Sequence, residues 1–265
     1  MSTQRILLTR PEGQGQVMMA HLEQGGWQVV NQPLIRIEAF TQDHGEAFHK
    51  LKQRILDFDQ YDIVISVSSN AAQLAEQWLD EYWPQLPAQQ AWFAVGPSSA
   101  QPLNPLLEAN GRSVTLPQGN HSEGLLALPA LHDVRDKKVI ILRGQGGREL
   151  IKQTLEARGA RVDYAELYAR KAIDLGPNAL HTLLTTQQIH YALVTSAEMV
   201  EQFDQNLEQS PLRQTLTLLV PSERIKSVAI ALGFTHTHVC QPIDGPTVLS
   251  CLRELSLRAK GINGE

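Results

Sequence analysis

Two stretches of the chain align with each other at a constant offset and without a gap: ILLTRPEGQGQVMMAHLEQGGWQVVNQPLIR (residues 6–36) and VIILRGQGGRELIKQTLEARGARVDYAELYA (residues 139–169). In this alignment Arg10 falls on Arg143. An internal repeat of this length indicates two similar structural units. The repeat therefore predicts a duplicated architecture, with a cleft between the two halves where a ligand could bind.

Length and composition restrict the class of protein. The chain has 265 residues, of which 42% are hydrophobic and 19% charged, with a net charge of −5. These values are typical of a globular protein with enough apolar material for real cores. The sequence contains no block of basic residues, which argues against nucleic acid as the main partner. No apolar run approaches the roughly 20 residues that span a bilayer.

The start of the chain and its cysteine content bear on the cellular compartment. The opening MSTQRILLTR lacks the apolar centre of a secretion signal. Two cysteines, Cys240 and Cys251, are too few for a disulfide framework. We therefore expect a soluble, cytoplasmic protein with no nucleic-acid or membrane partner.

Short apolar segments alternate with helical ones along the chain, and a second pair of segments also repeats. DIVISVSSNAA resembles HYALVTSAEMV, which places Ser68 on Ser196. Such alternation predicts an α/β fold with parallel sheets. The segments expected to be short strands are residues 6–10, 62–69, 92–95, 113–117, 138–144, 190–196, 216–222 and 237–242.

Two long segments decide how the repeated units are grouped. VVNQPLIRIEAF (29–40) and VDYAELYARKAI (162–173) could each extend about 40 Å as a strand, twice the usual length. The units could pair in chain order, or the chain could cross over between them. Strands long enough to leave one sheet for another favour the crossing. We expect a discontinuous domain 1 (1–37 and 172–265) and a domain 2 (38–171).

The turns that follow the predicted strands are rich in small polar residues. In an open parallel sheet, ligands bind at the carboxyl ends of the strands, where helix N-termini present free N–H groups that suit anions. Helix capping explains any one of these turns equally well. Together they predict a polar edge that binds a ligand. The turns are TRPEGQG (9–15), SVSSNAA (66–72), GPSSA (96–100), RGQGG (143–147), TSAEM (195–199) and PSERI (221–225).

Two motifs suggest other functions and are set aside. RGQGG resembles part of a dinucleotide-binding turn, but Glu149 stands where the third glycine should be. His236, His238 and Cys240 alternate along a predicted strand, but the sequence indicates no fourth ligand. We interpret that segment as an ordinary strand face rather than a metal site.

Tyr168 marks a departure from the internal symmetry, because it aligns with Ile35. Functional asymmetry in a duplicated fold should appear at such positions. Tyrosine is also a good strand former and is often half-buried. The repeat alone leaves both interpretations open.

Several segments, taken in order, are similar to those of the uroporphyrinogen-III synthase family, in the form found in gamma-proteobacteria. They are LLTRPEG, VSSNAA, VGPSSA, VIILRGQGGRELIKQTLEARGARV, ELYAR and LVTSAEM, and they span nearly the whole chain. The resemblance implies two flavodoxin-like parallel-sheet domains, joined by a two-stranded connector, with an interdomain cleft. It also implies that linear hydroxymethylbilane loses water and closes to uroporphyrinogen III with ring D inverted. No cofactor or metal is implied.

The resemblance also implies roles for individual residues. Tyr168 matches the connector tyrosine that assists loss of the substrate hydroxyl, and a phenol with a pKa of about 10 stays protonated at neutral pH. The turn containing Ser222 departs from the G-P-T-T-A-like turn common in the family. The residues expected to bind substrate are Arg10, Ser68, Ser69, Asn70, Gly96, Ser98, Ser99, Arg143, Gly144, Gly147, Arg148, Thr195, Ser196 and Ser222.

The substrate so implied is a polycarboxylate, whereas this chain is acidic, so its binding must depend on local donors and arginines. We expect a monomer. The alternatives are a non-catalytic two-domain protein that binds a small ligand, and a regulatory module of a larger assembly.

Overall fold

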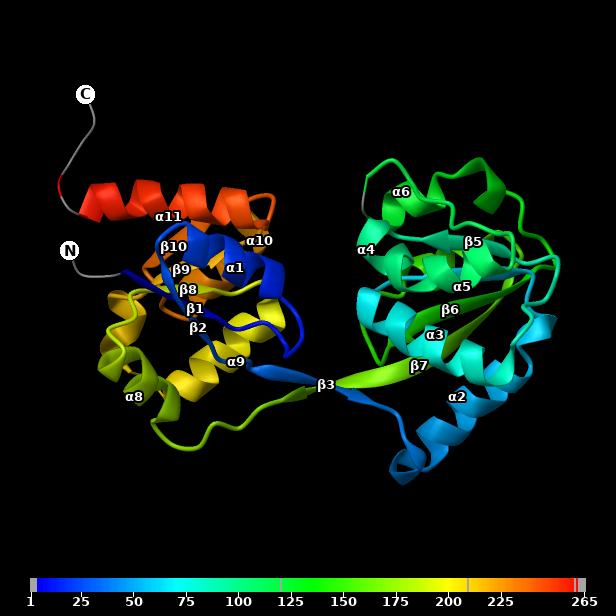
Figure 1. Cartoon of the computed structure of the whole chain (residues 1–265), viewed down its shortest axis with the longest axis horizontal. Helices are drawn as coiled ribbons and strands as arrows, with labels where there is room; N and C mark the ends of the chain where they lie inside the picture. The colour runs from blue at the N-terminus through cyan, green and yellow to red at the C-terminus, as the bar shows by residue number, and fades with distance from the viewer. Residues whose placement is uncertain (1–3, 120, 209, 260, 262–265) are drawn as a thin grey trace. The chain divides into compact units, whose positions relative to one another are not determined.

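The computed structural model describes residues 4–119, 121–208, 210–259 and 261. The chain forms two compact units (Figure 1). Unit 1 combines the N-terminal part of the chain up to Arg36 with the part from Lys171 onward, and unit 2 is Ile37–Arg170. The chain therefore passes from unit 1 to unit 2 and back.

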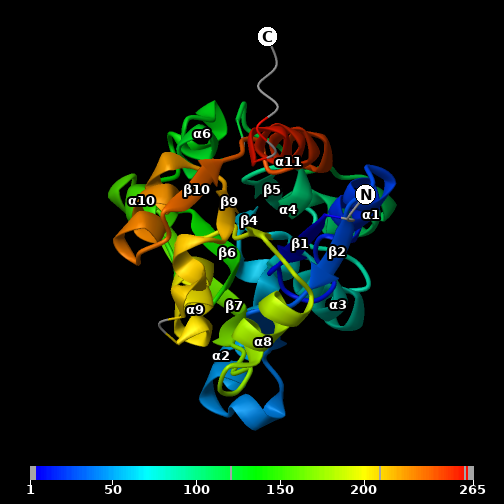
Figure 2. The ribbon, with the colours of Figure 1, turned by 90° about the vertical axis from the view of Figure 1, so that its left-hand side faces the viewer.

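Unit 1 contains a five-stranded sheet in the order β10-β9-β8-β1-β2. All four neighbouring pairs are parallel. Helices α8, α9 and α10 cover one face, and α1 and α11 cover the other (Figure 2). The strands are β1 (Arg5–Leu8), β2 (Gln28–Asn31), β8 (Tyr191–Leu193), β9 (Thr217–Val220) and β10 (His236–Val239). The helices are α1 (Gln16–Gln24), α8 (Ala179–Thr186), α9 (Ala197–Leu207), α10 (Glu223–Ala231) and α11 (Gly245–Ala259).

Unit 2 contains a second five-stranded sheet, in the order β3-β7-β6-β4-β5. Strands β7, β6, β4 and β5 are mutually parallel. Its strands are β3 (Ile35–Ala39), β4 (Ile63–Ser66), β5 (Ala91–Ala94), β6 (Lys138–Gly144) and β7 (Arg161–Ala172). Its helices are α2 (Glu46–Leu56), α3 (Ser69–Tyr82), α4 (Pro97–Ala100), α5 (Asn104–Ala109), α6 (Ser122–Leu126) and α7 (Leu150–Ala157). The expected α/β class with parallel sheets is confirmed.

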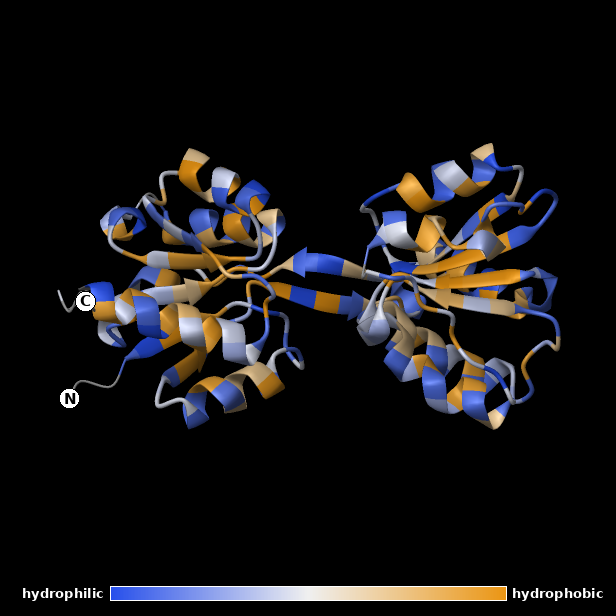
Figure 3. Cartoon of the chain, turned by 90° about the horizontal axis from the view of Figure 1, so that it is seen from above, coloured by the Kyte–Doolittle hydropathy of each residue, from blue (hydrophilic) through white to orange (hydrophobic). Residues whose placement is uncertain are grey.

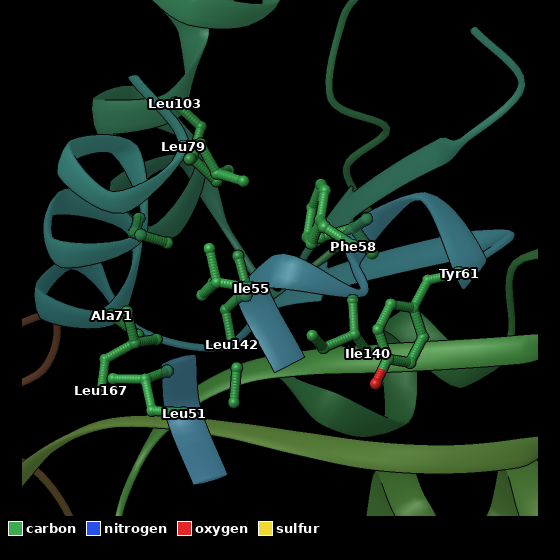
Figure 4. Packing of buried hydrophobic residues seen from close by; sticks show 14 of the residues in the cluster. Leu51, Ile55, Phe58, Tyr61, Ala71, Leu79, Leu103, Ile140, Leu142 and Leu167 are labelled. Atoms are coloured by element: carbon green, nitrogen blue, oxygen red, sulfur yellow. The ribbon is translucent and has the colours of Figure 1, made fainter. Parts of the chain in front are cut away.

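Each sheet is buried because its strands carry apolar side chains on both faces. On β4, Val64 packs into a core beneath α2 and α3, whereas Ile63 and Ile65 pack into a core on the opposite face. Figure 4 shows Leu51 and Ile55 of α2 pointing toward Leu142 and Leu167 of the sheet. Figure 3 shows the same pattern across the chain, with largely apolar strands and helices that alternate polar and apolar residues.

Several local predictions differ from the structure. The segment 29–40 is two strands, because the chain leaves the β conformation at Gln32–Leu34, which contains Pro33. The partner segment is a single strand, β7, of 12 residues. The predicted strand 113–117 contributes one isolated bridge, from Thr115 to Phe93.

Two side-chain contacts also shape these elements. The cap of α6 is His121, whose Nδ1 accepts the N–H of Gly124. Cys240 and Cys251 form a disulfide between the end of β10 and α11, a pair that the sequence analysis did not expect.

Candidate functional site

The carboxyl ends of β4, β6 and β7 surround a cavity of ≈ 250 Å³ in unit 2. This is the edge at which ligands bind in open parallel sheets. Three arginines and two tyrosines contribute to its wall, which indicates a site for an anionic ligand. The lining residues are Val67, Ser68, Ser122, Ile141, Arg143, Gly144, Gly146, Gly147, Arg148, Ile151, Tyr164, Tyr168 and Arg170.

Tyr168 is held on this wall by an irregular part of the sheet. The β6–β7 register shifts between Arg143 and Gly144, so that Gly144 lies opposite Tyr168 rather than opposite Leu167. The side chain is almost fully buried, with 2% of its surface exposed. Its hydroxyl lies 3.2 Å from Oγ of Ser68, the residue that precedes α3. The cavity therefore contains a phenol in a defined position.

Arg143 is buried and its donors are directed at its own loop. Its Nε donates to the carbonyl of Gly144 at 3.1 Å, and its Nη2 donates to the carbonyl of Gly146. Its Nη1 contacts Oε1 of Glu149 at 3.2 Å. The guanidinium thus organises the loop between β6 and α7. Gly147 fits this arrangement, since its φ is +98° and a Cβ there would lie 3.1 Å from Nη2 of Arg143.

Tyr164 on β7 contacts Arg143 and Glu149 and so also holds the loop between β6 and α7. The Arg143 Cζ lies 4.3 Å from the ring centroid and the Lys152 Nζ lies 4.8 Å from it. Its hydroxyl donates to Oε2 of Glu149 at 2.5 Å. Burial and this hydrogen bond raise the pKa of Tyr164. The same hydrogen bond, with Arg143 and Lys152 nearby, lowers the pKa of Glu149, so the carboxylate is ionised at neutral pH.

The other residues that we expected in unit 2 follow β4 and β5. Ser69 and Asn70 form the first turn of α3, and Ser69 is exposed. Gly96 precedes α4. Ser98 lines a different cavity, and Ser99 is 3% exposed. The structure therefore brings six of the expected residues to one cavity, namely Ser68, Arg143, Gly144, Gly147, Arg148 and Tyr168. Ser69, Asn70, Gly96, Ser98 and Ser99 do not line that cavity.

The expected residues of unit 1 also lie at carboxyl ends of strands. Ser196 caps α9, with its Oγ accepting the N–H of Met199 at 3.1 Å. Ser222 caps α10 in the same way through Ile225, at 3.5 Å. The side chain of Thr195 contacts Sδ of Met199. Arg10 follows β1, and burial lowers its pKa.

Sequence reasoning missed Tyr164, Glu149, Ser122 and Arg170. The symmetry criterion that selected Tyr168 would also have found two of them. Tyr164 aligns with Asn31 of the first repeat, and Glu149 aligns with Gln16. No comparable signal marks Ser122.

Features of the described residues also bear on metal binding and on membrane spans. Within the described ranges, no cluster of three or more His, Cys, Asp or Glu side chains could hold a metal ion. Burial lowers the pKa of His238, which lies on β10. Among the helices of the part of the chain that is described, none has the length and apolar character needed to cross a bilayer.

Comparisons with known proteins identify the family of the chain. The family described as Uroporphyrinogen-III synthase HemD matches residues 16–246 of the chain. The chain belongs to the uroporphyrinogen-III synthase family. Uroporphyrinogen-III synthase of Escherichia coli (strain K12) is 32% identical over 255 residues, which cover 94% of this chain and 99% of that protein. The Salmonella typhimurium uroporphyrinogen-III synthase is also 32% identical, over 254 residues.

Solved uroporphyrinogen-III synthases share the fold. A Thermus thermophilus mutant enzyme has a TM-score of 0.64 at 16% identity and covers 96% of this chain and 99% of its own. The Helicobacter pylori enzyme has a TM-score of 0.60 at 13% identity, covering 96% of this chain and 100% of its own. Membership of the uroporphyrinogen-III synthase family makes the chain a cyclising lyase of tetrapyrrole biosynthesis, EC 4.2.1.75.

Proposed function

We propose that the chain converts linear hydroxymethylbilane into uroporphyrinogen III, with inversion of ring D and loss of water, and that Tyr168 is its catalytic acid. The observation that carries the proposal is the buried phenol on the wall of a cavity that Arg143, Arg148 and Arg170 also line. A protonated phenol beside a cationic wall suits a polycarboxylate substrate that must lose a hydroxyl group.

The first step needs one proton. The electron-rich pyrrole pushes its nitrogen lone pair toward the hydroxymethyl carbon, and the C–O bond breaks as Tyr168 gives its proton to the departing hydroxyl, which leaves as water. Proton donation of this kind typically accelerates a reaction by about 10²–10⁴-fold. The substituted carbon of the last ring then attacks the resulting cation and forms a spiro intermediate. The original bond from that carbon to its methylene bridge breaks, and the bridge bonds instead to the free carbon of the same ring, which loses its proton.

The second task is to hold the chain of pyrroles. Uncatalysed closure gives the uninverted isomer, so the protein must hold the last ring in the orientation that leads to inversion. Backbone N–H groups at the starts of α3, α7, α9 and α10 can receive the substrate carboxylates. Arg10, Thr195, Ser196 and Ser222 of unit 1 contribute further donors to the substrate carboxylates. The working form is a cytoplasmic monomer.

The decisive experiment is isomer analysis. Purified protein is mixed with freshly generated hydroxymethylbilane, and the oxidised products are separated as type I and type III. If the proposal is correct, the sample with protein yields mainly type III, whereas buffer alone yields type I. A non-catalytic binding protein, the competing function, would leave type I as the product while the linear substrate still bound.

A further inference from the structure

Ser68 is bonded on two sides, and only one of its bonds serves the helix. Its Oγ accepts the N–H of Ala71 at 3.1 Å, which makes Ser68 the cap of the 14-residue helix α3. The same oxygen lies 3.2 Å from the Tyr168 hydroxyl. A serine hydroxyl has one proton and two lone pairs. The Ala71 N–H takes one lone pair, which leaves the proton of Ser68 available for Tyr168.

The Tyr168 ring is held in this position from the other side by Gly144. A Cβ on Gly144 would lie 2.5 Å from both Cε2 and Cζ of the Tyr168 ring, and 2.9 Å from its hydroxyl oxygen. The ring therefore packs directly on the Gly144 backbone. The next residue, Gln145, donates its N–H to the Tyr168 carbonyl at 2.7 Å, which fixes the tyrosine backbone as well.

We propose that Ser68 is a positioning residue for the reaction: it donates its proton to the Tyr168 oxygen and thereby directs the phenolic proton toward the substrate. This inference rests on the proposed function of Tyr168. A hydrogen bond in the opposite sense would direct the phenolic proton at Ser68 instead of at the leaving hydroxyl. The bond from the Ala71 N–H favours the productive sense, because a hydroxyl that accepts a hydrogen bond is polarised toward donating its own proton.

The role of Ser68 grows as the reaction proceeds. When Tyr168 has given its proton to the leaving hydroxyl, the substrate carries a positive charge and the phenolate a negative one. The Ser68 proton then bonds to an anion, and hydrogen bonds to charged groups are stronger than those between neutral groups. The N-terminus of α3, which carries partial positive charge, stabilises the same anion through Ser68. The phenolate recovers a proton when the closing pyrrole loses its own from the carbon that forms the new bond.

Unit 1 has the same cap without the tyrosine. Ser196 accepts the N–H of Met199 at 3.1 Å at the start of α9, and it aligns with Ser68 in the repeat of the two segments. In the described part of unit 1, Ser196 makes no hydrogen bond to a tyrosine hydroxyl like that of Ser68. Comparing Ser68 with Ser196 therefore distinguishes the effect of losing a helix cap from the effect of losing the proposed bond to Tyr168.

The test is a double-mutant cycle on kcat. Ser68→Ala should lower kcat by about tenfold, the factor that a hydrogen bond of ordinary strength represents, with KM unchanged. Ser68→Thr, which keeps a hydroxyl and a good cap, should restore kcat. In a Tyr168→Phe background, Ser68→Ala should lower kcat no further. Multiplicative losses in the double variant would overturn the inference, as would a wild-type kcat for Ser68→Ala.

Two controls keep the result interpretable. Ser68→Gly deletes the hydroxyl but largely keeps the helix cap, and it should lower kcat as Ser68→Ala does even if the alanine variant is unstable. Ser196→Ala removes the matching cap of α9, and its effect on kcat should be the same in wild-type and Tyr168→Phe backgrounds. A full wild-type kcat for Tyr168→Phe would instead overturn the catalytic role of Tyr168 in the proposed function.

Discussion

The two repeated β-helix-β modules differ most at the positions where their chains leave the sheet. In unit 1 the second strand, β2, ends at Asn31, whereas in unit 2 the equivalent strand β7 runs for 12 residues to Ala172. That extension presents Tyr168 to a cavity, which is also lined by Tyr164, the residue of β7 that aligns with the last residue of β2. The module of unit 1 has Asn31 and Ile35 at the aligned positions. One copy of the duplicated module thus supplies the proposed catalytic group, while the other retains the shared scaffold.

The largest expected effect on kcat comes from removing the hydroxyl of Tyr168, a group that has no counterpart in the module of unit 1. Tyr168→Phe deletes one hydroxyl and keeps the ring that packs on Gly144, so kcat should fall by about 10²–10⁴-fold while the melting temperature stays nearly constant. The measurement is the initial rate of type III formation. Tyr61→Phe is the matched control, because its hydroxyl donates to Asp163 at 3.0 Å, away from the cavity. Its kcat should equal that of the wild type.

How far the sequence predicted this difference depends on the kind of interaction. The repeat predicted the α/β class and pointed to Tyr168, because duplicated strands and a broken symmetry are visible in residue types. It did not predict that Arg143 would direct its donors into its own loop, since that depends on a rotamer. The bond from Tyr164 to Glu149 joins residues on a strand and a loop, and its geometry depends on the packed sheet.

The strands predicted at one edge of each sheet show the same limit. The sequence predicted a strand at 113–117 and another at 237–242. Only the second forms, as β10, while Thr115 makes a single bridge. Alternation predicts an extended chain, but whether that chain pairs along its length is decided by the neighbouring strand and the helices that cover it.

The second prediction compares the aligned arginines. Arg143→Ala leaves the carbonyls of Gly144 and Gly146 without their buried donor, so the free energy of unfolding should fall by about 2–3 kcal/mol. KM should rise as the loop loses its shape. Urea denaturation and steady-state kinetics measure the two effects. Arg143→Lys should recover little, because an ammonium cannot form the same fork of hydrogen bonds.

Arg10 supplies the contrast for that experiment. Arg10→Ala in unit 1 should cost less than half as much stability as Arg143→Ala, because Arg10 is half-buried whereas the Arg143 side chain is only 6% exposed. Equal losses for the two variants would show that the arginine has a common structural role in both modules.

The third prediction tests the packing of Tyr168 on Gly144. The residue aligned with Gly144 in unit 1 is Pro11, which carries a Cβ, and its module has Ile35 in place of the tyrosine. Gly144→Ala should lower the free energy of unfolding by about 1–3 kcal/mol through overpacking and should lower kcat by displacing the ring. Adding Tyr168→Ile, the unit 1 residue, should recover part of the stability but none of the activity. If Gly144→Ala retains wild-type stability and kcat, the close packing is not required.

The smallest expected effect concerns Glu149, which aligns with Gln16. Its pKa is lowered first by the hydrogen bond from Tyr164 and then by Arg143 and Lys152. A carboxyl whose pKa is lower in the folded state stabilises the fold above its unfolded pKa of about 4.3. That contribution is lost as the pH falls through the lower folded value. Glu149→Gln should therefore cost about 0.5 kcal/mol at pH 7, because the carboxylate is largely exposed.

The same substitution should matter less in acid. Below the folded pKa of Glu149 the wild-type carboxyl is neutral, like the glutamine amide, so the unfolding free energies of the two proteins should converge. Thermal melts at pH 7, 5, 4 and 3 measure that convergence. Tyr164→Phe removes the hydroxyl without changing a charge. The difference in unfolding free energy between this variant and the wild type should also become smaller as the pH falls, but by less than for Glu149→Gln. A gap that stays constant across this range would mean that Glu149 supports the loop through shape rather than charge, and that the loops of the two modules differ less than their charges suggest.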